Sequence, residues 1–175
     1  QATGSRYANR EAVQQNHDQM RAAVLAVPGV ESVALSTMIP LGGNFDRYGV
    51  HAQDKPLENP ELAPSADRYT VTPDFLKTLR VPLRDGRVFT EDETRDTVAR
   101  VALVSEGLAR RYWPGESAVG KNIRVGGPQR PWFQVIGVVG DIRHTGLEET
   151  ISMQVYVPER QWFYEESAMV LVARV

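Results

Sequence analysis

The spacing of apolar residues in the first part of the chain predicts an amphipathic helix over residues 7–26. The apolar positions that define it are Val13, Met20, Val24 and Val27. Pro28 and Gly29 should end this helix, because proline cannot continue the backbone hydrogen bonds and glycine allows a left-handed exit. This first segment is therefore expected to turn one apolar side toward the rest of the protein.

Alternating apolar and polar positions predict short strands in the rest of the chain. The segments with this pattern are residues 30–37, 48–52, 69–71, 100–104, 122–125, 133–139, 154–157 and 169–175. Short helices are expected over residues 75–79, 90–93 and 106–112. The residues expected to cap them are Thr72, Thr90 and Ser105. Residues 85–87 read as a turn. Because strands and helices mix irregularly, the pattern predicts an α+β fold rather than a doubly wound sheet.

A proline-rich stretch interrupts this series of elements. Residues 53–66 carry Pro56, Pro60 and Pro64 together with several acidic side chains. Proline lacks the N–H that a central strand needs, so this stretch is expected to form a loop or linker.

Composition narrows the function classes further. The chain has 175 residues, 42% of them hydrophobic, and at this length a folded chain buries about 70% of its unfolded surface. It has no cysteine, which excludes a disulfide scaffold, a cysteine-ligated zinc and a thiol nucleophile. The formal charge of −2 gives no field that attracts nucleic acid, so no nucleic-acid partner is expected. No apolar run approaches the roughly 18 to 20 residues that cross a bilayer.

One motif suggests nucleotide binding. Residues 115–121, from Gly115 to Lys121, match the G-x-x-x-x-G-K core of a phosphate-binding P-loop. A P-loop follows a buried strand and opens a helix, so that backbone amides face the phosphates. Here a helix should precede the motif, a strand should follow it, and Asn122 replaces the serine or threonine that binds magnesium. We therefore predict a helix-to-strand turn with Lys121 in solvent, and a small nucleotide-binding enzyme is the least favoured function.

Other candidates for chemistry are equally weak. His17, His51 and His144 share no metal-ligand spacing and are expected at the solvated surface. A Ser/His/Asp set drawn from Ser105, His144 and Asp141 lacks the G-x-S-x-G context, and Ser105 is explained as a helix cap. We accordingly predict no catalytic, cofactor-binding or metal-binding residue, and no enzyme.

Three consecutive aromatic residues offer a different kind of site. Trp162, Phe163 and Tyr164 cannot all point inward on one helix or strand. They are predicted to form a partner-contact surface, with coverage of a small core edge as the equal alternative.

Seven short segments form an ordered series along the chain. They are PGVESV (28–33), VTPDFL (71–76), GRVFT (86–90), LARRYWPG (108–115), GKNIR (120–124), VIGVVGD (135–141) and VYVP (155–158). This series resembles the extracytoplasmic core domain of MacB/FtsX-type ABC transporter permeases. It looks closest to the large permeases of Acidobacteria and related bacteria, which often carry a duplicated permease unit.

The resemblance implies a two-lobed α+β domain. One lobe, similar to the porter modules of other efflux systems, would be built from residues 1–70 and 152–175. The other, called the sabre subdomain in that family, would be residues 71–151. The resemblance also explains residues 115–121 as a structural turn of this middle lobe.

The resemblance further implies a non-catalytic role at the periplasmic face of the bacterial inner membrane. In the family such a domain lies between the first two membrane helices of the permease, so the present chain is expected to be a soluble part of an integral membrane protein. The implied partners are those membrane helices, a cytoplasmic ABC ATPase, either fused or separate, a second permease copy and, as an open alternative, a periplasmic adaptor. ATP would be used only by the ATPase, and this domain would convert its work into efflux or mechanotransmission.

A periplasmic ligand- or lipoprotein-binding module is the alternative function. In that case a cleft between the lobes would hold an apolar substrate, with Phe75, Leu79 or Trp132 as candidate lining residues.

Overall fold

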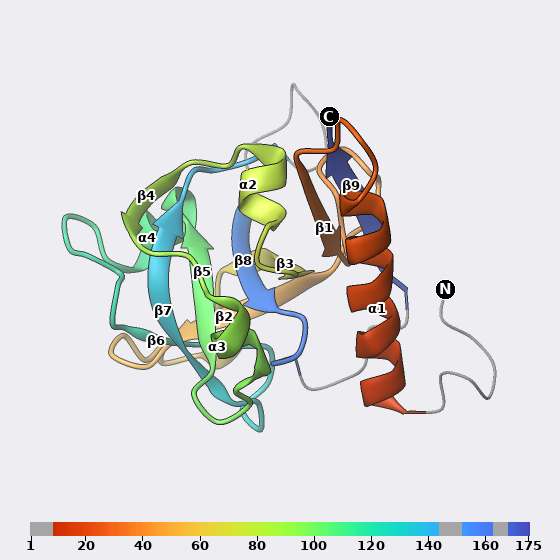
Figure 1. Cartoon of the computed structure of the whole chain (residues 1–175). Coiled ribbons are helices and arrows are strands. Elements are labelled where there is room, and N and C mark those ends of the chain that lie inside the picture. The colour runs from red at the N-terminus through yellow and green to blue at the C-terminus, as the bar shows by residue number, and fades with distance from the viewer. Residues whose placement is uncertain (1–8, 144–151, 163–167) are drawn as a thin grey trace.

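The computed structural model describes residues 9–143, 152–162 and 168–175 and combines helices with one twisted sheet (Figure 1). The helices are α1 (Arg10–Leu25), the 3-10 helix η2 (Pro60–Leu62), α2 (Phe75–Leu79), α3 (Glu91–Arg95) and α4 (Glu106–Tyr112). The strands are β1 (Ser32–Ser36), β2 (Arg47–Ala52), β3 (Ser65–Val71), β4 (Leu83–Gly86), β5 (Val101–Ser105), β6 (Asn122–Val125), β7 (Trp132–Val139), β8 (Met153–Pro158) and β9 (Val170–Arg174). This mixture confirms the predicted α+β class.

The sheet closes on itself through strand β2. Its strand order is β2-β6-β7-β5-β8-β3-β1-β9, and β2 also pairs with β3. Six of the described strands, from β2 through β6, β7, β5 and β8 to β3, therefore form a closed ring. Strands β1 and β9 extend the sheet beyond β3, and β4 pairs with β7. Strands from both predicted lobes take part in this ring, and the division into lobes stays a prediction.

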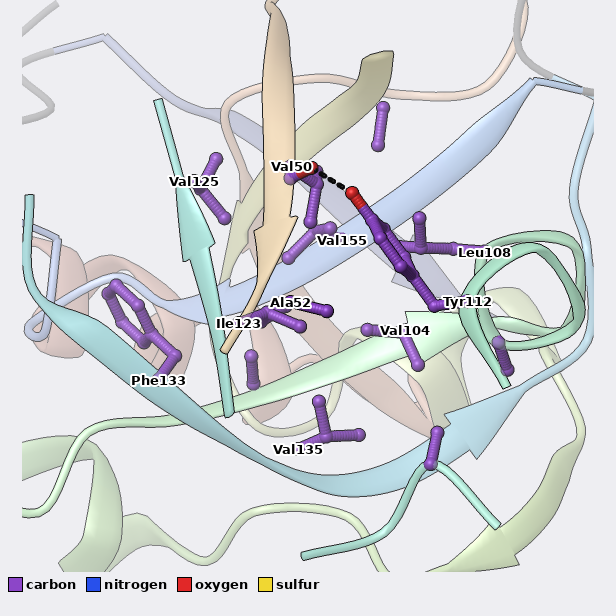
Figure 2. Close-up of a cluster of buried hydrophobic side chains, with 14 of the residues drawn as sticks. Val50, Ala52, Val104, Leu108, Tyr112, Ile123, Val125, Phe133, Val135 and Val155 are labelled. Carbon is purple, nitrogen blue, oxygen red and sulfur yellow. Dashed lines mark hydrogen bonds between the residues drawn. The ribbon is translucent and has the colours of Figure 1, made fainter. Parts of the chain in front are cut away.

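The ring encloses the larger of two clusters of buried side chains (Figure 2). Alternate residues of its strands point inward, because successive side chains of a strand point to opposite faces of the sheet. They include Val50, Ile123, Phe133, Val135 and Val155. At the ring's edge the Tyr112 hydroxyl of α4 donates a hydrogen bond to the Val50 carbonyl, so the helix is attached to β2 by polar contact as well as by packing.

The second cluster lies between the sheet and helix α2. Tyr69, Phe75 and Tyr156 form its centre, and the Tyr69 and Tyr156 rings are stacked with centroids 5.1 Å apart. Desolvation by burial is the main cause that raises the pKa of both tyrosines, and the nearby charge of Asp67 adds to it. Helix α1 lies at one side of the molecule, beside β1 and β9 (Figure 1). Within the described ranges, none of the helices is long and apolar enough to cross a membrane.

Local capping signals at two helices are confirmed. Ser105 Oγ accepts from the Leu108 N–H at 3.4 Å, and Thr90 forms a full capping box with Glu93. The prediction for Thr72 is wrong, because its hydroxyl accepts from the Leu35 N–H at 2.9 Å instead of capping α2. Thr72 therefore ties the start of α2 to strand β1.

Residues 85–87, read as a turn, are partly a strand. Leu83–Gly86 forms β4 and pairs with the second half of β7. Gly86 has φ +70°, and a Cβ atom there would lie 2.3 Å from the Ile136 carbonyl oxygen. Two backbones therefore touch at this point, and only glycine fits.

Candidate functional site

Helix α1 contacts the rest of the protein through Val13 and through charged and polar side chains on its inner face. Val13 and His17 are buried, and the Arg21 side chain is only 14% exposed. These positions are four residues apart, so they lie in one row on the helix. Asn9 starts the helix, since its Oδ1 accepts from the Ala12 N–H at 2.9 Å.

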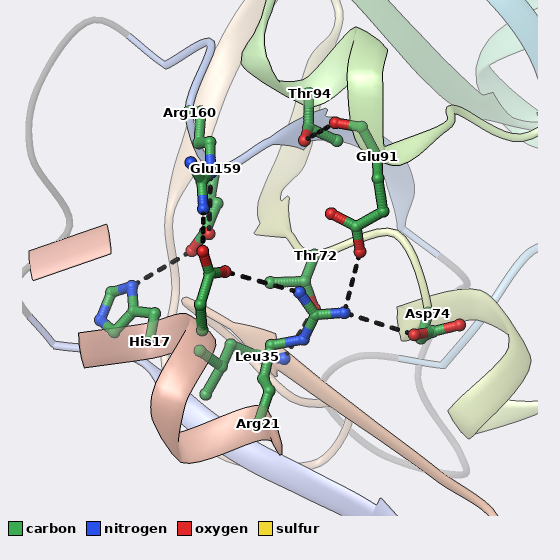
Figure 3. Close-up of polar contacts among 10 residues, drawn as sticks. His17, Arg21, Leu35, Thr72, Asp74, Glu91, Thr94, Glu159 and Arg160 are labelled. Atoms are coloured by element: carbon green, nitrogen blue, oxygen red, sulfur yellow. Dashed lines mark hydrogen bonds and ion pairs between the residues drawn. The ribbon is translucent and has the colours of Figure 1, made fainter. Parts of the chain in front are cut away.

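Arg21 joins three helices (Figure 3). Its Nη2 lies 3.3 Å from Asp74 Oδ2, at the start of α2, and 3.2 Å from Glu91 Oε1, at the start of α3. Its Nη1 also lies 3.9 Å from Asp18 on α1 itself. One guanidinium therefore connects α1 to two elements of the middle of the chain.

A second pair of contacts joins α1 to the segment that follows β8. His17 Nδ1 lies 3.2 Å from Glu159 Oε2, and both side chains are almost fully buried. Arg160 Nη2 donates to Asp18 Oδ2 at 2.5 Å. Asp18 thus lies between Arg21 and Arg160 and links the two sets of ion pairs.

A cavity of about 320 Å³ lies beside Arg21. It is lined by Asp18, Arg21, Ala22, Leu25, Val33, Asp74, Glu91 and Arg95. Arg21 Nε is buried there and has no hydrogen-bond partner within the described part of the chain. The charged lining residues Arg21, Asp74 and Glu91 are the same ones that join α1 to the starts of α2 and α3, so this cavity lies at the joint between these elements.

The P-loop-like segment is a turn between α4 and β6, as its context predicted. Lys121, expected in solvent, forms ion pairs instead: its Nζ lies 2.9 Å from Asp54 and 3.7 Å from Glu116. The hydrogen bond to Asp54 raises the pKa of Lys121. Asp54 also accepts from the Trp113 indole N–H at 3.1 Å. The lysine therefore fastens this turn to the end of β2.

Trp162 does not belong to an exposed surface. It is fully buried, with the Phe133 ring centroid 6.2 Å away and the Arg68 guanidinium 4.2 Å from its own ring centroid. It belongs to the buried cluster inside the ring, together with Phe133. Phe163 and Tyr164 lie outside the described residues, so a partner contact there stays a prediction.

The structure corrects the expectation for His17, which is buried rather than solvated. Its position four residues after Val13 was the available signal, since that spacing puts both residues on one helix face. His51 lies in β2, and His144 is outside the described residues. Ser105 and Asp141 have structural partners: Asp141 accepts from the Gly107 N–H at 2.7 Å and from Arg110 at 3.0 Å.

The candidate cleft residues are not brought together. Phe75 is fully buried and Leu79 packs on the same cluster, whereas Trp132 lies in a separate groove beside Arg124.

Sequence reasoning missed the buried charges completely. Arg68 is 3% exposed between Trp162 and Tyr48 and pairs with Asp46, and Asp67 is fully buried with Arg47 Nε at 2.9 Å. No local pattern marks these residues, because their partners come from other parts of the chain.

Three solved structures share this fold. They are the periplasmic region of MacB from Actinobacillus actinomycetemcomitans (20% identity, TM-score 0.57), the extracellular domain of the noncanonic ABC-type transporter YknZ from Gram-positive bacteria (18%, 0.54) and a domain of a putative permease protein from Porphyromonas gingivalis (19%, 0.57). The matches cover 82%, 81% and 88% of this chain, and 55%, 61% and 65% of those chains.

Sequence comparison agrees. A macrolide export ATP-binding/permease protein MacB from Syntrophobacter fumaroxidans is 34% identical over 71 residues, which is 41% of this chain and 9% of that protein. The chain thus spans a small part of this relative's length. The family model of the MacB-like periplasmic core domain matches residues 3–174. Since that match covers nearly all of its residues, the chain belongs to the family of MacB-like periplasmic core domains.

Proposed function

We propose that this chain is the extracytoplasmic domain of an ABC transporter permease and that it transmits movement without catalysing a reaction. A cytoplasmic ATPase would hydrolyse ATP, and the permease's membrane helices would pass the resulting displacement to this domain at the periplasmic face of the inner membrane. A second permease copy and a periplasmic adaptor are proposed partners of the assembled transporter.

The observation that carries this proposal is the contact of Arg21 with Asp74 and Glu91, at 3.3 and 3.2 Å. The Arg21 side chain is only 14% exposed, but the two carboxylates are 41% and 49% exposed, so water can replace Arg21 at either carboxylate at a cost on the order of 1 kcal/mol. Helix α1 is therefore joined to α2 and α3 by contacts that exchange at little cost. Such polar contacts suit a helix that slides against its neighbours, whereas a closely packed apolar interface would resist the movement.

The test is a distance measurement in the full-length transporter with its ATPase. This chain has no cysteine of its own. Spin labels can therefore be attached to cysteines introduced at Ala23 of α1 and Asp92 of α3, which are both exposed. A control pair at Asp92 and Gln129 lies within the middle of the chain. We expect the first distance to change between ATP-trapped and nucleotide-free states, and the control distance to stay constant.

Replacement of Arg21 provides the matched variant. Arg21→Met keeps an unbranched apolar stem but removes the guanidinium that contacts Asp74 and Glu91. We expect a broadened distance distribution between α1 and α3 in the nucleotide-free state. A distance between α1 and α3 that stays the same in every nucleotide state of the wild-type transporter would overturn the proposal.

A further inference from the structure

A groove of about 180 Å³ lies between the proline-rich segment after β2 and the hairpin of β6 and β7. Its chemically distinctive lining residues are His51, Lys55, Pro56, Leu57, Arg124 and Trp132. The groove is separate from the contacts of α1, and the proposed movement does not use it. Among the described residues, its lining contains two cationic side chains and no acidic side chain.

Arg124 has unused capacity to bind an anion. Its guanidinium carbon lies 4.7 Å from the Trp132 ring centroid, and Nη1 makes only a long contact of 3.4 Å with the Pro128 carbonyl. Its Nε is buried and has no hydrogen-bond partner among residues 9–143, 152–162 and 168–175. In the part of the chain that the structure describes, no carboxylate forms an ion pair with Arg124. A guanidinium stacked on an indole keeps its planar N–H groups free for a carboxylate.

Lys55 and His51 complete the polar side of the groove. Lys55 makes a long ion pair with Glu116, at 3.7 Å, and both side chains are about half exposed. This lysine can therefore turn toward a bound anion at little cost. His51 lies directly across from Arg124 in the β2–β6 pairing. Burial and then the charge of Arg124 lower the pKa of His51, so its imidazole is neutral at neutral pH.

Part of the groove lining is apolar and stiff. Pro56, Leu57 and Pro60 contribute to it, and the Trp132 indole adds an aromatic surface. The prolines limit the backbone conformations of this segment in the unbound protein, which reduces the conformational entropy lost on binding. A cavity of about 150 Å³ holds one benzene ring, so the groove is large enough for a single flat group.

We propose that this groove binds a small carboxylate that carries one flat apolar group. The carboxylate would lie between Arg124 and Lys55, and the apolar group would pack against Trp132 and Leu57. This proposal is independent of the transmission of movement by α1.

The test titrates the chain with benzoate and follows the Trp132 indole N–H by NMR. Benzamide has the same shape without the charge and serves as the ligand control. Because hydrogen bonds to charged groups are the stronger ones, we expect benzoate to bind about tenfold more tightly than benzamide. Arg124→Gln should weaken benzoate binding by a similar factor. Arg111→Gln, an exposed arginine on α4, should leave it unchanged.

The thermal unfolding of each variant is measured first. If Arg124→Gln does not fold, Arg124→Lys replaces it, since lysine keeps the charge but loses the planar fork and should still weaken binding. Equal binding of benzoate and benzamide, unchanged binding in the folded Arg124 variant, or no saturable shift at Trp132 would each overturn the proposal. Inorganic phosphate that binds as tightly as benzoate and displaces it would also overturn the proposal, because the groove would then be a general anion site.

Discussion

Glu93 shows how one carboxylate can serve two structural purposes. Arg87, just after β4, donates two hydrogen bonds to it at 2.7 and 2.6 Å, and the Thr90 N–H donates another at 3.0 Å. The bonds from Arg87 are the main cause that lowers the pKa of Glu93 to about 2. The same residue thus caps α3 and holds the chain that leads into it.

This lowered pKa predicts a stability difference that depends on pH. Because the folded pKa of Glu93 is about 2 and its ordinary value is 4.5, the ionised carboxylate stabilises the fold above pH 4.5 and loses that effect toward pH 2. We expect Arg87→Gln to lower the free energy of unfolding by about 0.5 to 1 kcal/mol at pH 7, since Arg87 is largely exposed.

Urea denaturation at several pH values measures this effect. The gap between wild type and variant should narrow as the pH falls from 5 to 2. Arg87→Lys keeps the charge but not the fork, so its loss should be smaller. A Glu93 carboxyl that titrates near pH 4.5 by NMR in the wild type would contradict the explanation.

At the scale of one element, strand β4 depends on a close approach of two backbones. Gly86 is held at φ +70°, with no room for a side chain between it and the Ile136 carbonyl. Gly115, in the turn after α4, has a similar φ of +77°, but no atom lies within 4 Å of the Cβ position. The two glycines share a conformation and differ only in their surroundings.

Alanine substitution separates these two effects. Gly115→Ala should cost about 1 to 2 kcal/mol of stability, from the left-handed backbone alone. Gly86→Ala should cost at least about 1 kcal/mol more, because β4 must move away from β7 to admit the methyl group. Chemical denaturation of both variants gives the comparison. Equal losses would mean that the pairing of β4 contributes nothing to stability.

At the scale of the whole molecule, the closed ring combines distant parts of the chain. Strand β3 pairs in parallel with β8, from Ala66 with Met153 to Val71 with Pro158, and β8 pairs with β5 on its other side. The large core inside the ring contains side chains from β2, β5, β6, β7 and β8. Neither predicted lobe encloses this core with its own strands alone.

Shared strands predict one cooperative unfolding transition rather than two. Hydrogen exchange at increasing urea concentration should give the same midpoint for the amides of β3, β7 and β8, and far-UV circular dichroism should agree with it. If β7 exchanged at a clearly lower urea concentration than β3, residues 71–151 would unfold as a separate unit.

Local features of this fold could be predicted from the sequence, and distant ones could not. The caps at Ser105 and Thr90 depend on residues three positions away, so their signals are complete within a short segment. Strand β4 was missed because its formation depends on β7, while its own Asp85 and Gly86 have the composition of a turn.

The joint around α1 was missed for the same physical reason. Arg21 and His17 look like surface residues until Asp74, Glu91 and Glu159 are placed beside them by the fold. The role of Thr72 likewise changed, because the nearby strand β1 offers its hydroxyl a backbone N–H. Polar side chains whose partners lie far along the chain carry no local pattern.

The parallel pairing of β3 with β8 also affects how quickly this domain can fold. Strand β3 can pair early with β1 and β2, but its parallel partner β8 is synthesised much later, and the ring cannot close before that point. Loops this long lose much entropy on closure before any contact compensates for it. The domain is therefore expected to fold slowly, in a late step that follows synthesis of β8, and to expose the edge of β3 that pairs with β8 until then.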